Sequence, residues 1–553
     1  MDDTLTSRIA AWIAEDPDDA TRAELARLRA QADAGDAAAA AEVTDAFAGR
    51  LAFGTAGLRA AMGPGPNRMN RVVVTQASWG FGRWLREDEH FPAGGRVLVG
   101  YDARHDSDMF ARDTAEVLTG LGLAPWLTAT HVPTPVVAFG LKHLGAAGAV
   151  QVTASHNPAR DNGYKVYNAD GSQIVPPMDA QIATRIGEMA GRPVSEAPRS
   201  AAYETTGDDL IDAYVARIAT LVADARTHDL VWAYTPMHGV GGAVMERIVA
   251  ATGFPAPVIV AQQFTPDPDF PTVSFPNPEE PGAMDLVIAA AERAGADIAI
   301  ATDPDADRCG VAAKMADGWR RLTGDEVGVL LGDDAMRRGT PGVFACSIVS
   351  STMLRTMATA RRRIFVPTLT GFKWIGRVPG LAFGYEEAIG YCCDPAHTAD
   401  KDGLSAMVVL LRLAAELKAA GRTIADRLDE IDAEFGPHTT TQHSVRVEHL
   451  GQIADMMARL RAAPPSSLAG EPVTARDWLT APANGLIATD AVEFTGERIH
   501  VVVRPSGTEP KLKCYLEARA TPEAARHDLA GARTANRATL DAVWDQLATV
   551  LGA

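Results

Sequence analysis

The chain has 553 residues, of which 47% are hydrophobic and 22% charged, a composition typical of soluble globular proteins. At roughly 100–200 residues per domain, this length predicts about three to five domains. The formal net charge of −18 argues against generic binding to nucleic acid or to an anionic membrane, because both need a basic surface. It still allows an anionic small substrate in a locally basic cleft.

Residues 1–50 are predicted to form a helical arm. Apolar residues recur at helical spacing at Ile9, Trp12 and Ile13, and the later stretch "AAAAAEVTDAF" is rich in alanine. We assign no function to this arm.

Strands and helices alternate from about residue 70. "RVLVGYDAR", "PWLTAT" and "AGAVQVTAS" predict strands, and "DMFARDTAEVLTGLG" and "VVAFGLKHLG" predict the helices between them. The pattern recurs twice, with strands at "LVWAYTP", "PVIVAQQ" and "DIAIATDPDADR" and then at "GVFACSIVSS", "RIFVPTLTG" and "LAFGYEEAIG". Such alternation is typical of largely parallel sheets covered by helices.

The C-terminal part of the chain has a different pattern. "HSVRVEHLGQIADMMARLRAA" and "GLIATDAVEFTGERIHVVVRPSGTEPKLKCYLEARA" predict antiparallel strands with helices, an α+β domain. We interpret "FGPHTTTQH" as the linker before it.

Three polar clusters follow predicted strands. Ser155 follows "AVQVTA", Asp303 follows "DIAIAT", and Glu386 follows "LAFGY". Open α/β sheets bind ligands at the carboxyl ends of their strands, so the three loops could line one cleft.

The strongest chemical signal is "DPDADR", residues 303–308. Asp303, Asp305 and Asp307 are spaced i, i+2, i+4, which in an extended segment places their carboxylates on one face. Convergent carboxylates repel unless a cation lies among them, and oxygen ligands suit Mg²⁺. A solvated acidic loop is the alternative.

The other candidate motifs are weaker when judged singly. Ser155, in "TASHNP", could simply form a turn, and His156 is too near in sequence for a Ser-His-Asp triad. "RPSGTEPKLK" could cradle an anion with Arg504 and a backbone turn, or could be an ordinary hairpin. "GTAGLR", with Arg59, lacks the ending of a P-loop.

Taken together and in order, the motifs point to one family. The chain resembles the α-D-phosphohexomutase superfamily, with its phosphoglucomutase/phosphomannomutase family, over almost its whole length. The matching motifs are "GTAGLR", "GYDAR", "TASHNPARDNGYKVY", "DPDADR", "GFKWIG", "EEAIG" and "RPSGTEPK". "TGFKW" and "EEAIGY" are also similar to the branch that contains phosphopentomutases.

The resemblance implies an α/β fold of four domains around a central cleft: three similar mixed α/β sheet domains and an α+β C-terminal domain. We expect residues 1–210 to form the helical arm and the domain with the phosphoserine loop. Residues 211–315 would carry the metal-binding loop, 316–436 the sugar-recognition loop, and 437–553 the phosphate-binding loop.

The resemblance also implies roles for single residues. Ser155 would carry a phosphoryl group. Lys165 and Arg59 match family positions for acid–base and charge assistance, and His156 would orient the loop. As a general base, Lys165 would need a lowered pKa, which neighbouring cations could provide. The metal ligands would be Ser155, Asp303, Asp305 and Asp307. Substrate contacts would come from Arg308, Lys373, Glu386 and Lys401, and phosphate contacts from Arg504, Ser506, Gly507, Thr508, Lys511 and Lys513.

The implied activity is a phosphosugar mutase that interconverts a hexose 1-phosphate and a hexose 6-phosphate, glucose being the first choice. It would use Mg²⁺, a phosphoserine and a sugar 1,6-bisphosphate as intermediate and activator. Phosphomannomutase and phosphopentomutase are the alternatives within this class, because Ala388 stands where many members have a serine. A serine-dependent phosphatase and a non-catalytic sugar-phosphate sensor are the alternatives outside it.

Partners and location follow from the same observations. We expect a small-molecule sugar phosphate as ligand, no nucleic acid, no membrane, and a monomer or dimer. The five cysteines form no metal pattern, the first residues lack an apolar signal core, and no run of about 20 apolar residues occurs. We therefore expect a cytoplasmic protein.

Overall fold

The computed structural model describes residues 3–87, 95–447, 449–483, 485–506 and 511–552. The chain divides into two compact units. Unit 1 comprises Met1–Ala312 and Asp394–Ala415, and unit 2 comprises Ala313–Cys393 and Glu416–Ala553. In the described part of the chain, no helix is both long enough and apolar enough to cross a bilayer.

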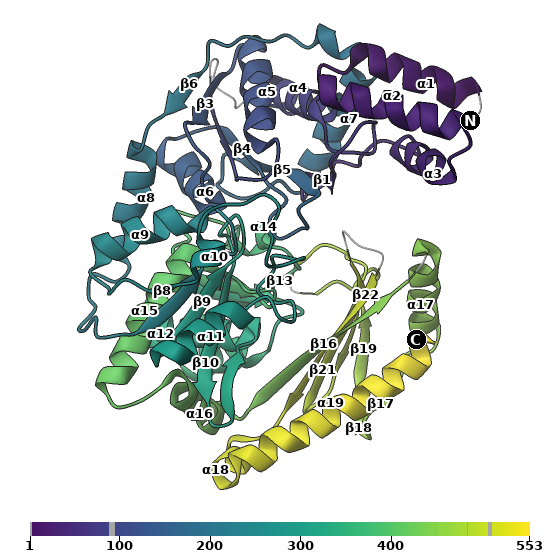
Figure 1. Ribbon diagram of the computed structural model, residues 1–553. Coiled ribbons are helices and arrows are strands. Elements are labelled where there is room, and N and C mark those ends of the chain that lie inside the picture. Colours follow the sequence, from purple (N-terminus) through teal and green to yellow (C-terminus); the bar gives the residue numbers. More distant parts are fainter. Residues whose placement is uncertain (1–2, 88–94, 448, 484, 507–510, 553) are drawn as a thin grey trace. The chain divides into compact units, whose positions relative to one another are not determined.

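Unit 1 begins with the predicted helical arm, a bundle of three helices that leads into the first sheet (Figure 1). The first sheet has the order β1-β5-β4-β2-β3-β6, in which β4, β2, β3 and β6 are parallel and β5 and β1 are antiparallel. The elements are α1 (Asp3–Glu15), α2 (Asp19–Asp33), α3 (Ala37–Ala46), β1 (Leu58–Ala61), α4 (Arg71–Glu87), β2 (Arg96–Tyr101), α5 (Ser107–Gly120), β3 (Ala124–Thr128), α6 (Thr134–His143), β4 (Gly148–Val152), β5 (Asp161–Asn168), α7 (Met178–Ala190), the 3₁₀ helix η1 (Val194–Glu196) and β6 (Glu204–Thr206).

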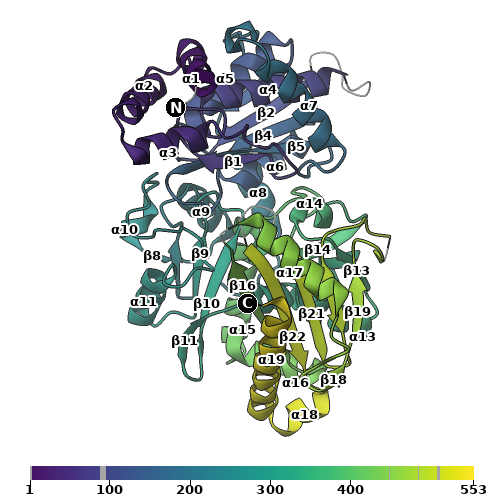
Figure 2. The same cartoon turned by 90° about the vertical axis from the view of Figure 1, so that its right-hand side faces the viewer.

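The core of the first sheet lies under α4, α5 and α7. Val97 and Val99 of β2 belong to one core with Phe81 of α4 and Phe110 of α5, whereas Leu98 and Gly100, which alternate with them, are buried on the side of α6. Helix α6 covers the opposite face, so the sheet is buried on both sides, as a parallel sheet requires (Figure 2).

The second sheet repeats this arrangement. Its order is β11-β10-β9-β7-β8, with β8, β7 and β9 parallel and β10 antiparallel to β9. "PVIVAQQ" forms only a two-residue strand and then a short helix, so that prediction was too long. The elements are α8 (Asp209–Thr220), β7 (Trp232–Thr235), α9 (Gly241–Thr252), β8 (Val258–Ile259), α10 (Ala261–Phe264), α11 (Asp285–Ala294), β9 (Ile298–Thr302), β10 (Cys309–Met315) and β11 (Gly318–Arg321), with α15 (Gly403–Ala419) starting in unit 1.

Unit 2 contains the third sheet, of order β13-β12-β14-β15. Strands β13, β12 and β14 are parallel and β15 is antiparallel to β14. The elements are α12 (Gly324–Arg337), β12 (Val343–Ser347), α13 (Met353–Ala360), β13 (Ile364–Thr368), α14 (Phe372–Ile375), β14 (Leu381–Glu386), β15 (Gly390–Cys392) and α16 (Ile424–Phe435).

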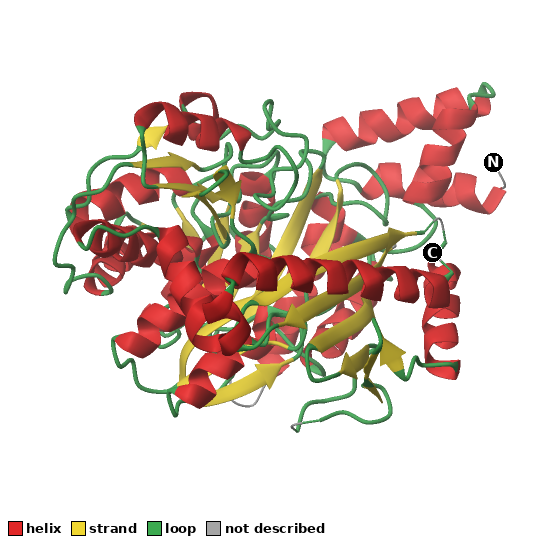
Figure 3. Cartoon of the chain, turned by 90° about the horizontal axis from the view of Figure 1, so that it is seen from below, coloured by secondary structure: helices red, strands yellow, loops and turns green. Residues whose placement is uncertain are grey.

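The fourth sheet is antiparallel throughout, as predicted for an α+β domain, and has the order β16-β22-β21-β20-β19. Two helices, α17 and the long α19, cover one face of it (Figures 1 and 3). The elements are β16 (His438–Arg446), α17 (Leu450–Ala462), β17 (Ser467–Leu468), β18 (Glu471–Pro472), β19 (Thr474–Asp477), β20 (Val492–Thr495), β21 (Ile499–Pro505), β22 (Lys511–Arg519), α18 (Pro522–His527) and α19 (Leu529–Leu551).

The linker interpretation of "FGPHTTTQH" was wrong. Phe435 ends α16, and from His438 onward the segment is strand β16, which pairs with β22 along its whole length. Its threonines suit a half-buried strand because β-branched side chains pack well there.

Each of the first three sheets contains an antiparallel hairpin whose first strand is one of the parallel strands. The hairpin loops are 153–160 between β4 and β5, 303–308 between β9 and β10, and 387–389 between β14 and β15. Each loop contains one non-glycine residue in the left-handed region, namely Ser155, Ala306 and Ile389. The three predicted polar clusters therefore lie at equivalent places in the fold.

Candidate functional site

Ser155 lies in the hairpin loop after β4, where its side chain is buried. The residue is 2% exposed and has a φ of 53°. Its Oγ donates a hydrogen bond to Oδ2 of Asp303 at 3.0 Å and lies 3.3 Å from Nδ1 of His156. The serine is therefore built into unit 1 rather than displayed on a solvent-exposed turn.

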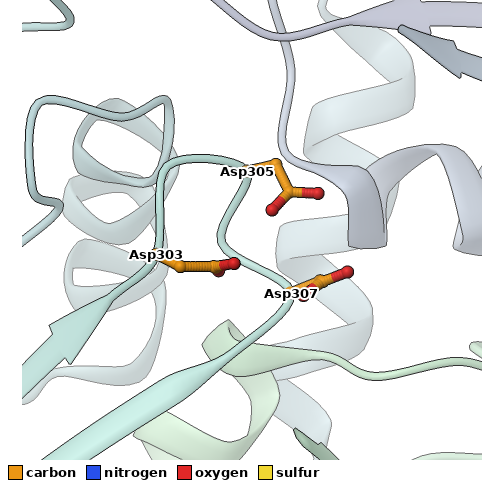
Figure 4. A group of neighbouring side chains, drawn as sticks. All are labelled: Asp303, Asp305 and Asp307. Carbon is orange, nitrogen blue, oxygen red and sulfur yellow. The ribbon is translucent and has the colours of Figure 1, made fainter. Parts of the chain in front are cut away.

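Asp303, Asp305 and Asp307 lie in the hairpin loop after β9. All three are fully buried, and one oxygen from each lies within 4.8 Å of the other two. Figure 4 shows their carboxylates turned toward the same side of the loop. The prediction that they converge is confirmed, and a solvated acidic loop is excluded.

The predicted reason for this convergence was wrong. The segment is not extended: the N–H of Ala306 donates to the carbonyl of Asp303 at 2.8 Å, and Ala306 has a φ of 56°. A turn, rather than the alternation of a strand, gathers the three side chains.

Three helix N-termini hold the aspartate loop through its successive carbonyls. The N–H of Val240, before α9, donates to the carbonyl of Pro304 at 2.8 Å. Thr134 of α6 donates to Asp305 at 2.9 Å, and Gly403 of α15 donates to Ala306 at 3.2 Å. The positive ends of three helix dipoles therefore lie at a cluster of negative charge, which they stabilise.

Lysine side chains lie directly against the aspartates. Nζ of Lys165, on β5, is 2.6 Å from Oδ2 of Asp305 and 2.7 Å from Oδ2 of Asp307. Nζ of Lys401 lies 3.3 Å from the same Asp307 oxygen. Lys401 thus belongs to the aspartate cluster of unit 1.

The pKa of Lys165 shifts opposite to the direction that we predicted for a general base. Burial lowers this pKa, but Asp305 and Asp307 outweigh burial, and the net pKa is raised. With these partners, Lys165 is an ammonium group that neutralises carboxylates.

The aspartates differ in pKa because their partners differ. Burial and the charge of Asp307 raise the pKa of Asp303 and of Asp305. Burial also acts to raise the pKa of Asp307, but Lys165, Lys401 and Arg308 hold it below its usual range.

The donor set fits a divalent cation. Oδ1 of Asp305 and Oδ1 of Asp307 are buried and, among the described residues, have no hydrogen-bond partner. A buried carboxylate oxygen without a partner is costly, and a hard cation such as Mg²⁺ satisfies it.

Two arginines and a neutral histidine also lie around the serine and the aspartates. Arg59, on β1, donates to Oδ1 of Asn157 at 3.1 Å, and the N–H of Arg308 donates to Oδ1 of Asp303 at 3.0 Å. Burial, with Arg308 and Arg59 nearby, holds the pKa of His156 well below its usual value, so the imidazole is neutral.

The remaining predicted residues belong to unit 2. Lys373 lies in the short helix α14, and Glu386 is the buried last residue of β14. Arg504 of β21 pairs with Lys513 of β22, and the N–H of Ser506 donates to the carbonyl of Lys511 at 2.8 Å. Nζ of Lys513 lies 5.9 Å from the centre of the Tyr515 ring. Gly507 and Thr508 lie outside the described residues.

Models of four domains match this chain in order. They are phosphoglucomutase/phosphomannomutase alpha/beta/alpha domains I, II and III, over residues 50–191, 212–316 and 323–434, and the C-terminal domain of the same family, over residues 445–530. The chain belongs to the phosphoglucomutase/phosphomannomutase family. It is therefore a phosphosugar mutase, an isomerase that acts by phosphoryl transfer.

Named mutases resemble the chain over most of its length. A "Probable phosphomannomutase" of Haemophilus influenzae is 44% identical over 82% of this chain and 93% of its own. A human phosphopentomutase is 33% identical over 94% of this chain and 92% of its own. A phosphoglucomutase/phosphomannomutase family protein of Burkholderia thailandensis has the same fold, with a TM-score of 0.70, 20% identity, and coverage of 91% of this chain and 98% of that one.

Sequence reasoning missed several residues that shape this mutase site. Thr134 holds Asp305, and Asp102 and Arg104 lie beneath the serine loop. The motif "GYDAR" contained the last two, but its spacing gives no hint of what they bind. No sequence motif pointed to Thr134, because its partner Asp305 lies 171 residues away in the chain.

Proposed function

We propose that this mutase interconverts a hexose 1-phosphate and a hexose 6-phosphate, with glucose as the preferred sugar, through phospho-Ser155. The observation that carries the proposal is the contact of Ser155 Oγ with Asp303, in one buried cluster with Asp305, Asp307 and Lys165. The nucleophilic oxygen of Ser155, the three aspartates that could bind a metal ion, and the ammonium group of Lys165 lie close together, as phosphoryl transfer needs.

Each transfer exchanges one oxygen–phosphorus bond for another. The bond between Ser155 Oγ and phosphorus breaks, a bond from the sugar hydroxyl to phosphorus forms, the hydroxyl loses its proton, and Ser155 Oγ gains one. The resulting sugar bisphosphate turns around, and its other phosphoryl group returns to Ser155.

Asp303, Asp305 and Asp307 are proposed to hold Mg²⁺ together with an oxygen of the phosphoserine. When bound, the ion offsets the negative charge of the transferring phosphoryl group. Lys165 and Arg59 add fixed positive charge, and His156 borders the serine oxygen.

The sugar contacts are proposed to come from Arg308, Lys373, Glu386 and Lys401. The non-reacting phosphate would meet the C-terminal loop, with Arg504, Ser506, Gly507, Thr508, Lys511 and Lys513. Lys165, Lys401, Arg59 and Arg308, all in unit 1, give a chain of net charge −18 a local group of cations around the aspartates.

A pentose phosphate is the second candidate substrate. The human phosphopentomutase matches 94% of this chain, which supports ribose or deoxyribose phosphate. Mannose phosphate is supported by the name of the Haemophilus influenzae relative. The same Ser155 chemistry serves all three sugars.

A substrate panel tests the proposal. Glucose, mannose, ribose and deoxyribose 1-phosphates are incubated with Mg²⁺ and a trace of sugar bisphosphate, and isomer and inorganic phosphate are followed by phosphorus NMR. Conversion of a hexose with kcat/KM about 100-fold above the pentoses supports glucose or mannose. A pentose preference replaces the sugar but keeps the mechanism. Release of inorganic phosphate without isomer indicates a phosphatase, and binding without turnover indicates a sensor.

Ser155→Ala tests the phosphoserine itself. The variant should bind substrate and keep its fold but lose turnover. Ser78→Ala, at a fully buried serine of α4, is the matched control and should stay active. Normal turnover in Ser155→Ala would remove the basis of the proposed mechanism.

A further inference from the structure

The serine loop has a backbone conformation that its own residues do not favour. Ser155 has a φ of 53°, in the left-handed region that L-residues rarely adopt. Within the loop, the N–H of Ser155 donates to Oγ1 of Thr153 at 2.8 Å, and that of Asn157 donates to the carbonyl of Ala154 at 3.1 Å. Such conformations persist where the surroundings fix them.

Arg104 supplies four further bonds, three to this loop and one to the first residue of β5. One terminal nitrogen of its guanidinium donates to the carbonyls of Pro158 at 2.9 Å and Asp161 at 3.0 Å. The other donates to the carbonyls of Ser155 at 2.6 Å and Asn157 at 2.7 Å. One planar group therefore binds main-chain oxygens on both sides of the loop's turn.

The guanidinium of Arg104 is itself held in place by Asp102 and Phe270. Arg104 is 4% exposed, and its Nε lies 3.3 Å from Oδ2 of Asp102. Asp102 in turn accepts hydrogen bonds from Oγ1 of Thr153 at 2.6 Å and Oγ of Ser107 at 2.7 Å. The Phe270 ring lies 5.0 Å from the guanidinium carbon. A buried charge that is paired and packed in this way has little freedom to move.

We propose that Arg104 is a positioning residue for phosphoryl transfer: its four bonds hold the loop so that Ser155 Oγ stays beside the aspartate cluster. The proposal rests on the proposed role of Ser155 as phosphoryl carrier. All four bonds go to main-chain oxygens, so Arg104 acts on the position of the serine.

If Arg104 has this role, replacing it should lower kcat and leave KM nearly unchanged. A displacement of about 1 Å at a reacting atom costs about 100-fold in rate, whereas sugar and phosphate contacts elsewhere are unchanged. Lysine keeps the charge but lacks the planar fork that reaches four carbonyls, so Arg104→Lys should recover little.

The test compares Arg104→Ala and Arg104→Lys with Arg412→Ala in the full chain. Arg412 is a matched control, because it is 5% exposed, lies in unit 1 and donates to the carbonyl of Leu221 and to Asp224. The assay uses glucose 1-phosphate, or ribose 1-phosphate if the panel favours it, with Mg²⁺ and the matching bisphosphate. Thermal unfolding of each variant is measured alongside.

We expect Arg104→Ala to lose about 100-fold in kcat with KM within a few-fold, and millimolar guanidinium chloride to restore at least about 10-fold of the lost kcat. Arg412→Ala should lose stability but keep kcat, and guanidinium should not change it. Arg104→Lys should lose at least about 10-fold in kcat.

Two results would overturn the proposal. One is equal loss of kcat in Arg104→Ala and Arg412→Ala without rescue, which indicates a general effect on folding. The other, decisive if Arg104→Ala does not fold, is wild-type kcat in Arg104→Lys. An active Ser155→Ala instead points to failure of the proposed function, so the two failures are distinguishable.

Discussion

Replacing Thr134 with valine should weaken the metal site without touching a metal ligand. Thr134 is fully buried, its hydroxyl donates to Oδ2 of Asp305, and its N–H donates to the carbonyl of Asp305. Thr134→Val removes the first bond, keeps the second and hardly changes the side-chain volume. Asp305 then loses one of the two partners that orient its carboxylate, and Lys165 remains.

The expected magnitude follows from that single bond. A hydrogen bond to a charged group contributes about 1.5–3 kcal/mol, and loss of a group that orients a metal ligand weakens metal affinity about 10–100-fold. We therefore expect Mg²⁺ titrations of Thr134→Val, by calorimetry and by activity, to show an apparent Kd raised by about 10–100-fold. At saturating Mg²⁺, kcat should approach that of the wild type.

Thr128→Val is the matched control in the same unit. Thr128 is 2% exposed, and its Oγ1 is buried without a hydrogen-bond partner among the described residues. Removing an unsatisfied hydroxyl should leave Mg²⁺ affinity unchanged and stability equal or higher. The reasoning is refuted if both variants bind Mg²⁺ like the wild type, or if both lose affinity equally.

Three further predictions follow. EDTA should stop turnover and added Mg²⁺ should restore it; a rate indifferent to EDTA would contradict the aspartate site. Gly57→Ala should lower the free energy of unfolding, measured by denaturant titration, by more than about 1 kcal/mol, because the new Cβ would lie 1.8 Å from the Tyr164 carbonyl oxygen. Gly35 also has a positive φ but lies in open space, so Gly35→Ala should lower the free energy of unfolding by less in the same titration. Burial raises the pKa of Asp325 to about 7. This carboxyl therefore stays protonated in the folded state while it ionises in the unfolded state, so its contribution to stability is largest at low pH and falls as the pH rises toward 7. Asp325→Asn should flatten the pH dependence of the unfolding free energy between pH 5 and 7 by up to about 1.4 kcal/mol per pH unit, and an unchanged slope in urea titrations would contradict this.

The periodicity of hydrophobic residues in the sequence predicted most of the helices and strands. The helical arm, the alternation of strands and helices, and the antiparallel C-terminal sheet are all confirmed. The positions of Ser155, Asp303 and Glu386 at or just after strand ends also follow from the sequence, because a short hydrophobic run marks each buried strand and the polar residues come at its end.

Features that depend on distant partners were not predictable from such patterns. Strand β16 looked like a linker because its partner β22 lies far along the chain. The raised pKa of Lys165 comes from Asp305 and Asp307, which are 140 and 142 residues away. A charged side chain in a single sequence has no visible partner, so neither the sign of its pKa shift nor its burial can be inferred.

The repeated hairpin explains how one framework supports different chemistry. In each of the first three sheets, the loop leaves a buried parallel strand, turns through a left-handed residue and returns as an antiparallel strand. Strand pairing fixes where each loop starts and ends, whereas the loops differ in length and in their side chains. Ser155 occupies the left-handed position itself in the first loop, whereas Ala306 occupies it in the second and leaves the flanking aspartates to converge. If Ser155 carries the phosphoryl group, as we propose, then glycine cannot take its place in this strained position. The bonds that Arg104 donates from outside the loop to the carbonyls of Ser155 and Asn157 then help to hold the conformation.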